Sequence, residues 1–332
     1  MEQIKSFMDK KELTSNYQKQ EAFEDALNSL NKQLSVSQAE LFQEDLKDQV
    51  TIHVIGAPRS GTTLMTQLAL SNIEIGYINN FIATFWNAPL YGILLSKKLL
   101  GENYQSDFKS DFGRTISVQE PHEFGYFWKY QLNYTDHLQQ TYNKEHNLPW
   151  DRLKNILYQM CFAYNKPILF KSFLYGFHIK KAVQKMPKTL FIYIERNLYQ
   201  NAYSILKLRQ KMFGDEAIWA SMKPHQYSIL KDENIYRQII GQVLFLNYEY
   251  KKQLSQIPES NKLLLSYSNI CTNTVEVIEE VHNKINELEA VNYNPKINNN
   301  IKENKVVIPQ KILQRFLKAE EWLVSTFSEL KK

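Results

Sequence analysis

"VTIHVIGAPRSGTTLMTQLAL", residues 50–70, contains a strand pattern, a glycine turn and a helix pattern in immediate succession. The first part is short and β-branched, as is typical of a central parallel strand, and the last part continues as a helix. The turn is close to the phosphate-binding pattern G-x-x-x-x-G-K-[ST], because Gly56 and Gly61 have the right separation. Thr62, however, stands where the phosphate-gripping lysine belongs.

Three further strand patterns follow at residues 167–173, 189–197 and 262–270, and each leads into a helical pattern. Strands that each deliver the chain into a helix predict an α/β fold with a central parallel sheet and helices on both faces. We therefore expect a single P-loop-like domain over residues 49–332.

Two segments stand outside this regular alternation. Residues 1–48 have apolar residues at helical spacing and predict an N-terminal helical extension packed on the core, with a dimerisation or lid role as the alternative. Residues 72–150 are rich in aromatic residues and predict a mainly helical insertion, which is either a small core of its own or the wall of a pocket.

Composition excludes several classes of protein. The 332 residues are 43% hydrophobic and 23% charged, which is typical of a globular chain. The net charge of +5 favours a small anionic ligand over a nucleic-acid partner. Cys161 and Cys271 are too few for a disulfide framework or a zinc site. No apolar run is long enough to span a membrane, so we expect a cytoplasmic enzyme.

The turn after the first strand can bind an oxyanion without the missing lysine. Successive N–H groups of small residues point inward there, and the helix N-terminus adds a partial positive charge. Ser60, Gly61, Thr62 and Thr63 supply these N–H groups together with hydroxyl donors, and Arg59 can reach an oxygen of a short anion.

"APRSGTTL" resembles the 5′-phosphosulfate loop of sulfotransferases that use 3′-phosphoadenosine-5′-phosphosulfate (PAPS). The pattern of that family is Pro-[Arg/Lys]-Ser-Gly-Thr-[Thr/Ser], and Pro58, Arg59, Ser60, Gly61, Thr62 and Thr63 match it position for position. The resemblance implies that these residues bind the donor PAPS, whose product is adenosine-3′,5′-bisphosphate, and it implies no metal.

A second motif extends the resemblance. The family follows a later strand with an arginine and, eight residues on, a serine that together hold the 3′-phosphate, and Arg196 and Ser204 have this spacing. The resemblance also implies that Lys171, at a strand end, faces the sulfonate, and that Tyr267 belongs to the nucleotide site. The Arg-Lys-Gly segment of many relatives is missing, with Lys302 and Lys305 as its only substitutes.

Sulfuryl transfer needs stabilisation of the departing phosphate and a base for the acceptor proton. Arg59 and Lys171 suit the first task. For the second, "QEPHEFGYFW" offers His122, Glu123 and Glu120, and the alternative is that this cluster only caps the helix that follows.

Aromatic residues of the insertion predict an apolar or ring-bearing small-molecule acceptor, sulfated on a hydroxyl or, less readily, on an amine. Their alternative role is in the core. A homodimer is compatible with the sequence. The candidate acceptor residues are Tyr77, Phe81, Phe85, Trp86, Phe124, Tyr126, Phe127 and Trp128.

Two other functions compete with a sulfotransferase. A nucleotide or small-molecule kinase with an atypical P-loop would need Mg²⁺ and ATP, and the missing lysine argues against it. A non-catalytic nucleotide-binding module would leave Lys171 and the cluster at His122 without a role. The sequence therefore favours PAPS-dependent sulfuryl transfer.

Overall fold

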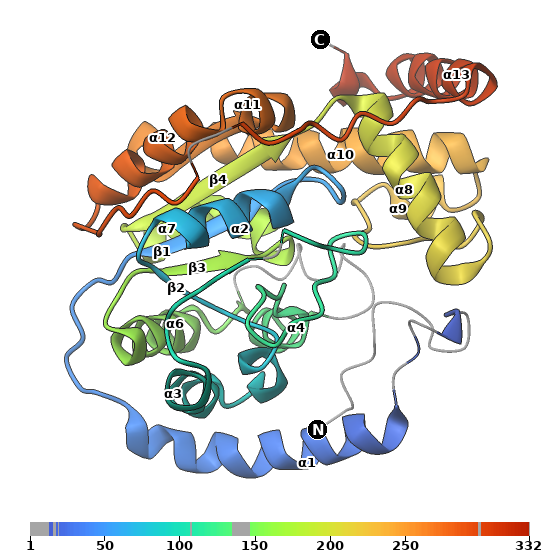
Figure 1. The fold of residues 1–332 in the computed structure, drawn as a ribbon. Coiled ribbons are helices and arrows are strands. Elements are labelled where there is room, and N and C mark those ends of the chain that lie inside the picture. Colours follow the sequence, from blue (N-terminus) through green and yellow to red (C-terminus); the bar gives the residue numbers. More distant parts are fainter. Residues whose placement is uncertain are drawn as a thin grey trace.

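A five-stranded, all-parallel sheet forms the centre of the protein (Figure 1). The computed structural model describes residues 13–15, 18, 20–106, 108–134, 147–297 and 300–331. The strand order is β2-β3-β1-β4-β5. The strands are β1 (Thr51–Ile55), β2 (Gly76–Tyr77), β3 (Ile168–Lys171), β4 (Thr189–Glu195) and β5 (Lys262–Ser266). The predicted α/β class is confirmed.

Helices cover both faces of the sheet because the strands are apolar on both sides. Ile52 and Val54 of β1 belong to the core beneath α2 (Thr62–Asn72) and α12 (Thr274–Asn286). The alternate residues face a second, larger core, which is closed by α6 (Trp150–Tyr164), α7 (Ile179–Lys185) and α10 (Ile235–Leu254). These layers hold the strands rigidly between them.

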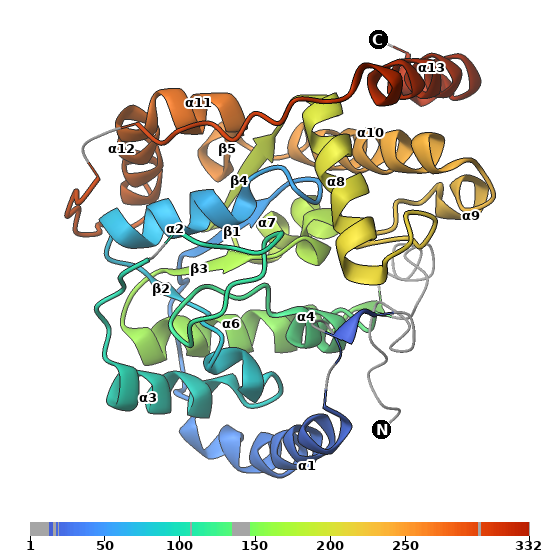
Figure 2. The ribbon, with the colours of Figure 1, turned by 45° about the vertical axis from the view of Figure 1, so that its right-hand side comes forward.

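The remaining helices lie around this three-layer centre. The long C-terminal helix packs on α10 beyond the end of the sheet (Figure 2). These helices are α1 (Glu21–Ser37), α3 (Pro89–Leu100), α4 (Gly125–Gln131), α8 (Leu198–Phe213), α9 (Tyr227–Leu230), α11 (Tyr267–Thr272) and α13 (Gln310–Thr326), with 3-10 turns at η3 (Gln38–Leu41), η4 (Ile82–Phe85), η6 (Leu174–His178), η7 (Glu259–Asn261) and η8 (Ser328–Leu330).

The N-terminal helix α1 is fastened to the insertion by a buried amide. Asn31 donates to the carbonyl of Thr84 (2.7 Å) and accepts from the N–H of Asn87 (2.8 Å). Gln38 accepts from the N–H of Leu90 in the same way (2.9 Å). Polar side chains that satisfy main-chain groups of η4 and α3 thus fix α1 below them (Figure 2).

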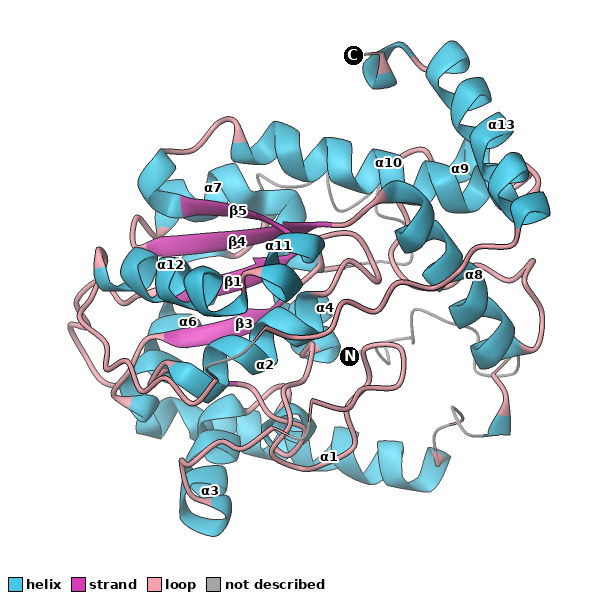
Figure 3. Ribbon diagram, turned by 45° about the horizontal axis from the view of Figure 1, so that its top comes forward, coloured by secondary structure: helices cyan, strands magenta, loops and turns pink. Residues whose placement is uncertain are grey.

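The parallel register places the carboxyl ends of four strands at one edge of the sheet (Figure 3). Val54 is opposite Lys171, and Ile55 is opposite Tyr193. The turn after β1, the last residue of β3, the end of β4 and the start of α11 therefore meet. Ligands of α/β proteins bind at such an edge, where the chain order reverses on either side of the first strand.

Three expectations from the sequence need correction. The last strand pattern was expected to reach residue 270, but β5 ends at Ser266, whose hydroxyl caps α11 by accepting from the N–H of Asn269. β2 was not foreseen, because two residues carry no periodic signal. The insertion is less helical than expected: residues 101–124, with Gly113 and Phe112 at positive φ, form no helix in the part that is described.

His53 on β1 makes stability depend on pH. Its ring is fully buried among Phe170, Phe191 and Tyr175, and burial lowers its pKa from 6.5 to about 3. The unfolded chain therefore binds this proton first as pH falls. We expect His53 to account for a loss of about 2 kcal/mol in unfolding free energy between pH 7.5 and 5.0.

Urea unfolding of the wild type and of His53→Phe at both pH values measures this contribution. The substitution should make the variant less sensitive to pH by that amount. An equal loss of stability in the two proteins would show that His53 is not the titrating group.

Candidate functional site

The turn between β1 and α2 forms an open anion-binding nest. Gly61 caps α2 at φ 110°, and Arg59 also has a positive φ, of 71°. Among the described residues, the N–H groups of Gly61, Thr62 and Thr63 find no acceptor, and the fully buried hydroxyl of Ser60 has no hydrogen-bond partner. An anion is the group that would satisfy these donors together.

Tyr267 packs against Gly61 of the nest. A Cβ atom placed on Gly61 would lie 2.4 Å from the ring of Tyr267, so only glycine allows this approach. A cation also contacts this ring, because the guanidinium of Arg196 lies 4.3 Å from the ring centroid. Gly61, Tyr267 and Arg196 therefore form one packed unit from three different parts of the chain.

Arg196 and Ser204 both reach the nest. Arg196 donates from Nη1 to the carbonyl of Arg59 (3.2 Å), and the hydroxyl of Ser204 accepts from Nε of Arg59 (3.1 Å). Asn197 caps α8 by accepting from the N–H of Gln200, which starts the helix directly after Arg196. The pair that the sequence predicted thus converges on Arg59. Pro58 adds a further contact between the turn and α8, since its carbonyl accepts a hydrogen bond from the side-chain amide of Asn201 (2.6 Å).

Lys171 at the end of β3 lies next to the nest and is almost completely buried, with 2% exposure. Its ammonium donates to Thr63 Oγ1 (2.7 Å) and to the carbonyl of Gly113 (3.1 Å), and it forms an ion pair with Glu123 (3.0 Å). Lys171 therefore joins the loop, the sheet and the insertion.

The site holds excess positive charge in a poorly hydrated place. Burial, with the nearby charge of Arg196, lowers the pKa of Arg59 to about 10, and Glu123 and Asp111 offset part of this effect. Burial also lowers the pKa of Arg196. Both guanidinium groups still carry a proton at neutral pH, so the edge of the sheet attracts anions.

The structure separates the three candidate bases. Only Glu123 lies beside Lys171, with 44% of its side chain exposed. His122 is exposed, and its Nδ1 accepts from the N–H of Phe124 (2.9 Å), so the neutral ring carries its proton on Nε2 and has no lone pair left for a substrate. The carboxylate of Glu120 is buried and accepts from Gln67 (2.8 Å) and Tyr104 (2.9 Å), which anchors the insertion to α2.

Most of the aromatic residues that were expected at an acceptor pocket are core residues. Phe124 stacks on Phe127 at 4.5 Å and Trp128 on Tyr175 at 4.8 Å, with all four almost completely buried. Rings at helical spacing on a helix that packs against the sheet face the interior, and this explains the difference. Tyr77, Phe85 and Trp86 are buried as well, whereas Phe81 and Tyr126 are half-buried.

The chain segment that contains Lys302 and Lys305 runs past Arg196. We call residues 300–306 the strap. Asn304 accepts from Nη2 of Arg196 through its main-chain carbonyl (2.8 Å), and Glu303 accepts from the hydroxyl of Ser268 (3.2 Å). The side chain of Lys305 is 72% exposed and paired with Glu303 (3.1 Å). The strap thus contacts Arg196 by its backbone.

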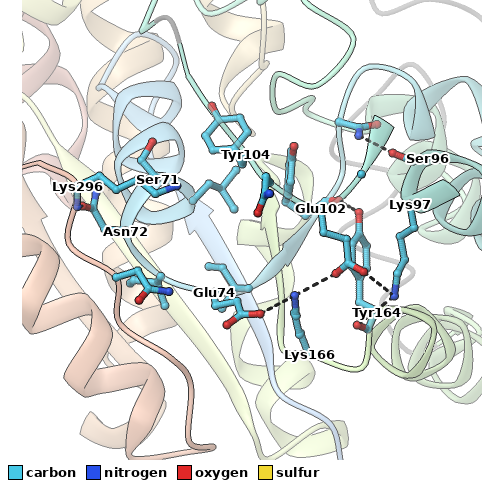
Figure 4. A pocket seen from close by; sticks show the side chains of 18 residues that line it. Ser71, Asn72, Glu74, Ser96, Lys97, Glu102, Tyr104, Tyr164, Lys166 and Lys296 are labelled. Carbon is cyan, nitrogen blue, oxygen red and sulfur yellow. Dashed lines mark hydrogen bonds and ion pairs between the residues drawn. The ribbon is translucent and has the colours of Figure 1, made fainter. Parts of the chain in front are cut away.

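A cavity of about 340 Å³ lies elsewhere, at the far end of α2 (Figure 4). That end is roughly 15 Å from the nest, given the helical rise of 1.5 Å per residue. The charges around the cavity pair with each other: Lys166 with Glu74 (2.9 Å) and Glu102 (3.0 Å), and Lys97 with Glu102 (3.2 Å). Lys296 lines the cavity too and forms no ion pair with a described residue, so the cavity offers one unpaired cation and suits an anion less well than the nest.

Within the described parts of the chain, no group of His, Cys, Asp and Glu side chains could hold a metal ion. The same residues include no helix that is long and apolar enough to cross a membrane. Cys161 and Cys271 are both buried free thiols.

Solved structures provide the comparison for this fold. A sulfotransferase of Mycobacterium avium is similar over 89% of this chain and 72% of its own, with 11% identity and a TM-score of 0.52. A sulfotransferase of Mycobacterium tuberculosis matches 86% of this chain and 75% of its own, at 11% identity and a TM-score of 0.47. No family model and no curated protein matches the sequence. The chain therefore has the fold of the sulfotransferases.

Sequence reasoning missed the turn Asp111–Arg114, which covers the nest from the insertion. The carbonyl of Gly113 accepts a hydrogen bond from Lys171, and the ring of Phe112 lies 5.2 Å from the guanidinium of Arg59. The only local signal is a glycine that follows an aromatic residue, and nothing in it indicates contacts with residues 50 or more positions away.

Substitution of Gly61 by alanine should disrupt the nest, because the new Cβ would collide with Tyr267 and φ is positive. Gly214→Ala is the matched control, since Gly214 has φ +70° but nothing within 4 Å of an added Cβ. We expect backbone strain of about 1 kcal/mol in the control and a total cost of about 3 kcal/mol or more for Gly61→Ala.

Urea unfolding of the two variants against the wild type measures both costs. Equal destabilisation by the two substitutions would show that the close contact between Gly61 and Tyr267 is not formed.

Proposed function

We propose that the protein is a PAPS-dependent sulfotransferase that transfers a sulfuryl group to a hydroxyl of a small acceptor. The observation that carries this proposal is the open nest of Ser60 to Thr63 beside the buried Lys171. A nest without the P-loop lysine, with a cation supplied from the neighbouring strand, suits a phosphosulfate better than the β/γ-phosphates of ATP. The sulfotransferase fold supports the same conclusion.

The residues at the sheet edge suit the donor part by part. Ser60 has an unpartnered buried hydroxyl and α2 has open N–H groups, which would hold the 5′-phosphosulfate. Arg196 and Ser204 would bind the 3′-phosphate, since Arg presents a forked donor set to phosphate oxygens. The carbonyl of Asn304 in the strap accepts a hydrogen bond from Arg196. Lys302 and Lys305 are the cations of the strap that would be available to a phosphate.

The donor, when bound, supplies an activated sulfur whose bond to the bridging phosphate oxygen breaks as the acceptor oxygen attacks. Lys171 and Arg59 would stabilise the negative charge that gathers on the departing phosphate, because hydrogen bonds fix the buried Lys171 and the half-buried Arg59 before the reaction begins. Thr63 orients Lys171 through its hydroxyl (2.7 Å).

Glu123 would take the proton of the acceptor hydroxyl. Its carboxylate is partly open to solvent and is held 3.0 Å from Lys171, next to the group to be transferred. The acceptor oxygen gains the sulfuryl group, its proton passes to Glu123, and the electron pair of the broken bond leaves with the bisphosphate. His122 has its acceptor nitrogen already engaged, which favours Glu123.

The acceptor side and the cellular context complete the proposal. The half-buried Phe81 and Tyr126 support an acceptor with an apolar or aromatic part. Two free, buried thiols suit a reducing compartment such as the cytoplasm.

Calorimetric titration with adenosine-3′,5′-bisphosphate tests the donor. We expect tight binding without Mg²⁺, weakened about 10- to 150-fold in Arg196→Ala through loss of a charge-assisted contact. Arg315→Ala, whose guanidinium donates to the Tyr236 hydroxyl away from the sheet edge, should bind like the wild type. Tighter binding of ATP with Mg²⁺ than of the bisphosphate would contradict the proposal and favour a kinase.

Substitution of the base tests the mechanism. Glu123→Gln should lower kcat about 10²- to 10⁴-fold while the affinity for adenosine-3′,5′-bisphosphate stays unchanged. His122→Asn serves as the comparison. Transfer of radiolabelled sulfate from PAPS to phenolic and aliphatic alcohols measures the rate. A large loss in His122→Asn with little loss in Glu123→Gln would give the role of base to His122.

A further inference from the structure

The turn Asp111–Arg114 lies against Lys171 and Thr63, beside the nest. Two main-chain hydrogen bonds close the turn, from the N–H of Asp111 to Arg114 (2.8 Å) and from the N–H of Arg114 to Asp111 (3.0 Å). At its tip, the carbonyl of Gly113 accepts from Lys171 Nζ (3.1 Å) and from Thr63 Oγ1 (3.4 Å).

Gly113 also lies beside a second cation, Arg59. A Cβ atom on Gly113 would lie 3.0 Å from Nη1 of Arg59, 3.4 Å from Thr63 Oγ1 and 3.9 Å from Lys171 Nζ. A neutral carbonyl oxygen therefore sits among donors that would otherwise face an anionic oxygen. The N–H groups of the nest and the Ser60 hydroxyl stay open below it.

Charged and aromatic contacts fasten the turn to α8. Asp111 pairs with Lys211 (2.5 Å), and both side chains are partly exposed. Between them and the nest, the ring of Phe112 lies 5.2 Å from the Arg59 guanidinium and 5.4 Å from the Lys211 ammonium. The same ring packs beside the small apolar cluster that contains Leu208 and Met212.

Arg59 divides the site into two halves. Its Nε faces Ser204, on the side of the 3′-phosphate pair, while its Nη1 faces Gly113. The contacts of the turn with Arg59, Thr63 and Lys171 therefore concern the sulfuryl half, and Arg196 and Ser204 are engaged separately.

We propose that the turn Asp111–Arg114 is an autoinhibitory plug, in which the Gly113 carbonyl takes the place of a sulfuryl oxygen and must be displaced before PAPS can bind productively. The inference rests on the proposed function. Adenosine-3′,5′-bisphosphate, which lacks the sulfuryl group, binds with the plug in place. The apparent affinity for PAPS is the affinity of the open state multiplied by the fraction of molecules in which the plug is open.

Gly113→Ala destabilises the plugged state, because the added Cβ would press on Arg59 at φ +89°. The affinity for PAPS should rise about 5- to 30-fold relative to that for the bisphosphate, the factor expected from strain at a left-handed residue. Gly101→Ala is the control in the same insertion, since φ there is +74° and nothing lies within 4 Å. Calorimetry with both nucleotides, without acceptor, gives the two affinities.

A reversible cross-link that holds the turn in the plugged state provides a second test. Asp111→Cys with Lys211→Cys, bridged by a short bis-methanethiosulfonate, fixes the turn to α8, and the two native thiols are buried. The locked protein should bind the bisphosphate with unchanged affinity and should no longer bind PAPS. Reduction of the cross-link should restore PAPS binding. Asp111→Cys alone, treated with the same reagent, should retain both.

The outcomes separate the plug from the proposed function. Equal binding of PAPS by the locked, the reduced and the Gly113→Ala proteins, with the bisphosphate bound by all, would overturn the plug alone. If the wild-type protein binds neither nucleotide, the sulfotransferase proposal fails and the plug falls with it.

Discussion

Three cations held at one edge of a parallel sheet are the constraint on which the rest of the site depends. Arg59, Lys171 and Arg196 come from the turn after β1 and from the ends of β3 and β4, so their proximity follows directly from the register of the strands. Burying like charges together is costly unless acids or hydrogen-bond acceptors surround them. The acceptors and acids around these cations therefore contribute to the stability of the fold.

The chain meets this requirement with groups from distant segments. Glu123 of the insertion pairs with Lys171, and Asp111 lies close enough to raise the pKa of Arg59 against the effects of burial and of Arg196. Main-chain carbonyls of Arg59 and Asn304 accept from Arg196. These acids belong to the insertion, so the insertion stabilises the cations at the edge of the sheet that it covers.

Much of this arrangement could be predicted from the sequence. The β-branched pattern before Gly56 locates β1, and the parallel topology then requires the ends of β3 and β4 to lie beside it. The resemblance to the sulfotransferases, and not topology, singled out Lys171, Arg196 and Ser204, and in the structure all three lie beside the nest. The fold class could be predicted because strand periodicity and crossover rules are local or topological.

Other features depend on contacts that no local pattern contains. Glu123 and His122 are neighbours in the chain, and only the path of the backbone after Pro121 turns one carboxylate toward Lys171. The aromatic residues of the insertion could equally line a pocket or fill a core, and packing against Phe170 and Tyr175 decides for the core at Trp128. The turn at Gly113 is recognised only once Lys171 is seen to donate to it.

The strap shows how a protein can keep a structural element while its sequence changes. Arg196 is held there by the main-chain carbonyl of Asn304, and Gln200 forms hydrogen bonds with both the N–H and the carbonyl of Val306. Any residue except proline at position 306 offers the same groups. Selection would then preserve the backbone path of the strap rather than its amino-acid sequence. Homologues could therefore differ in sequence at these positions and still form the same main-chain contacts.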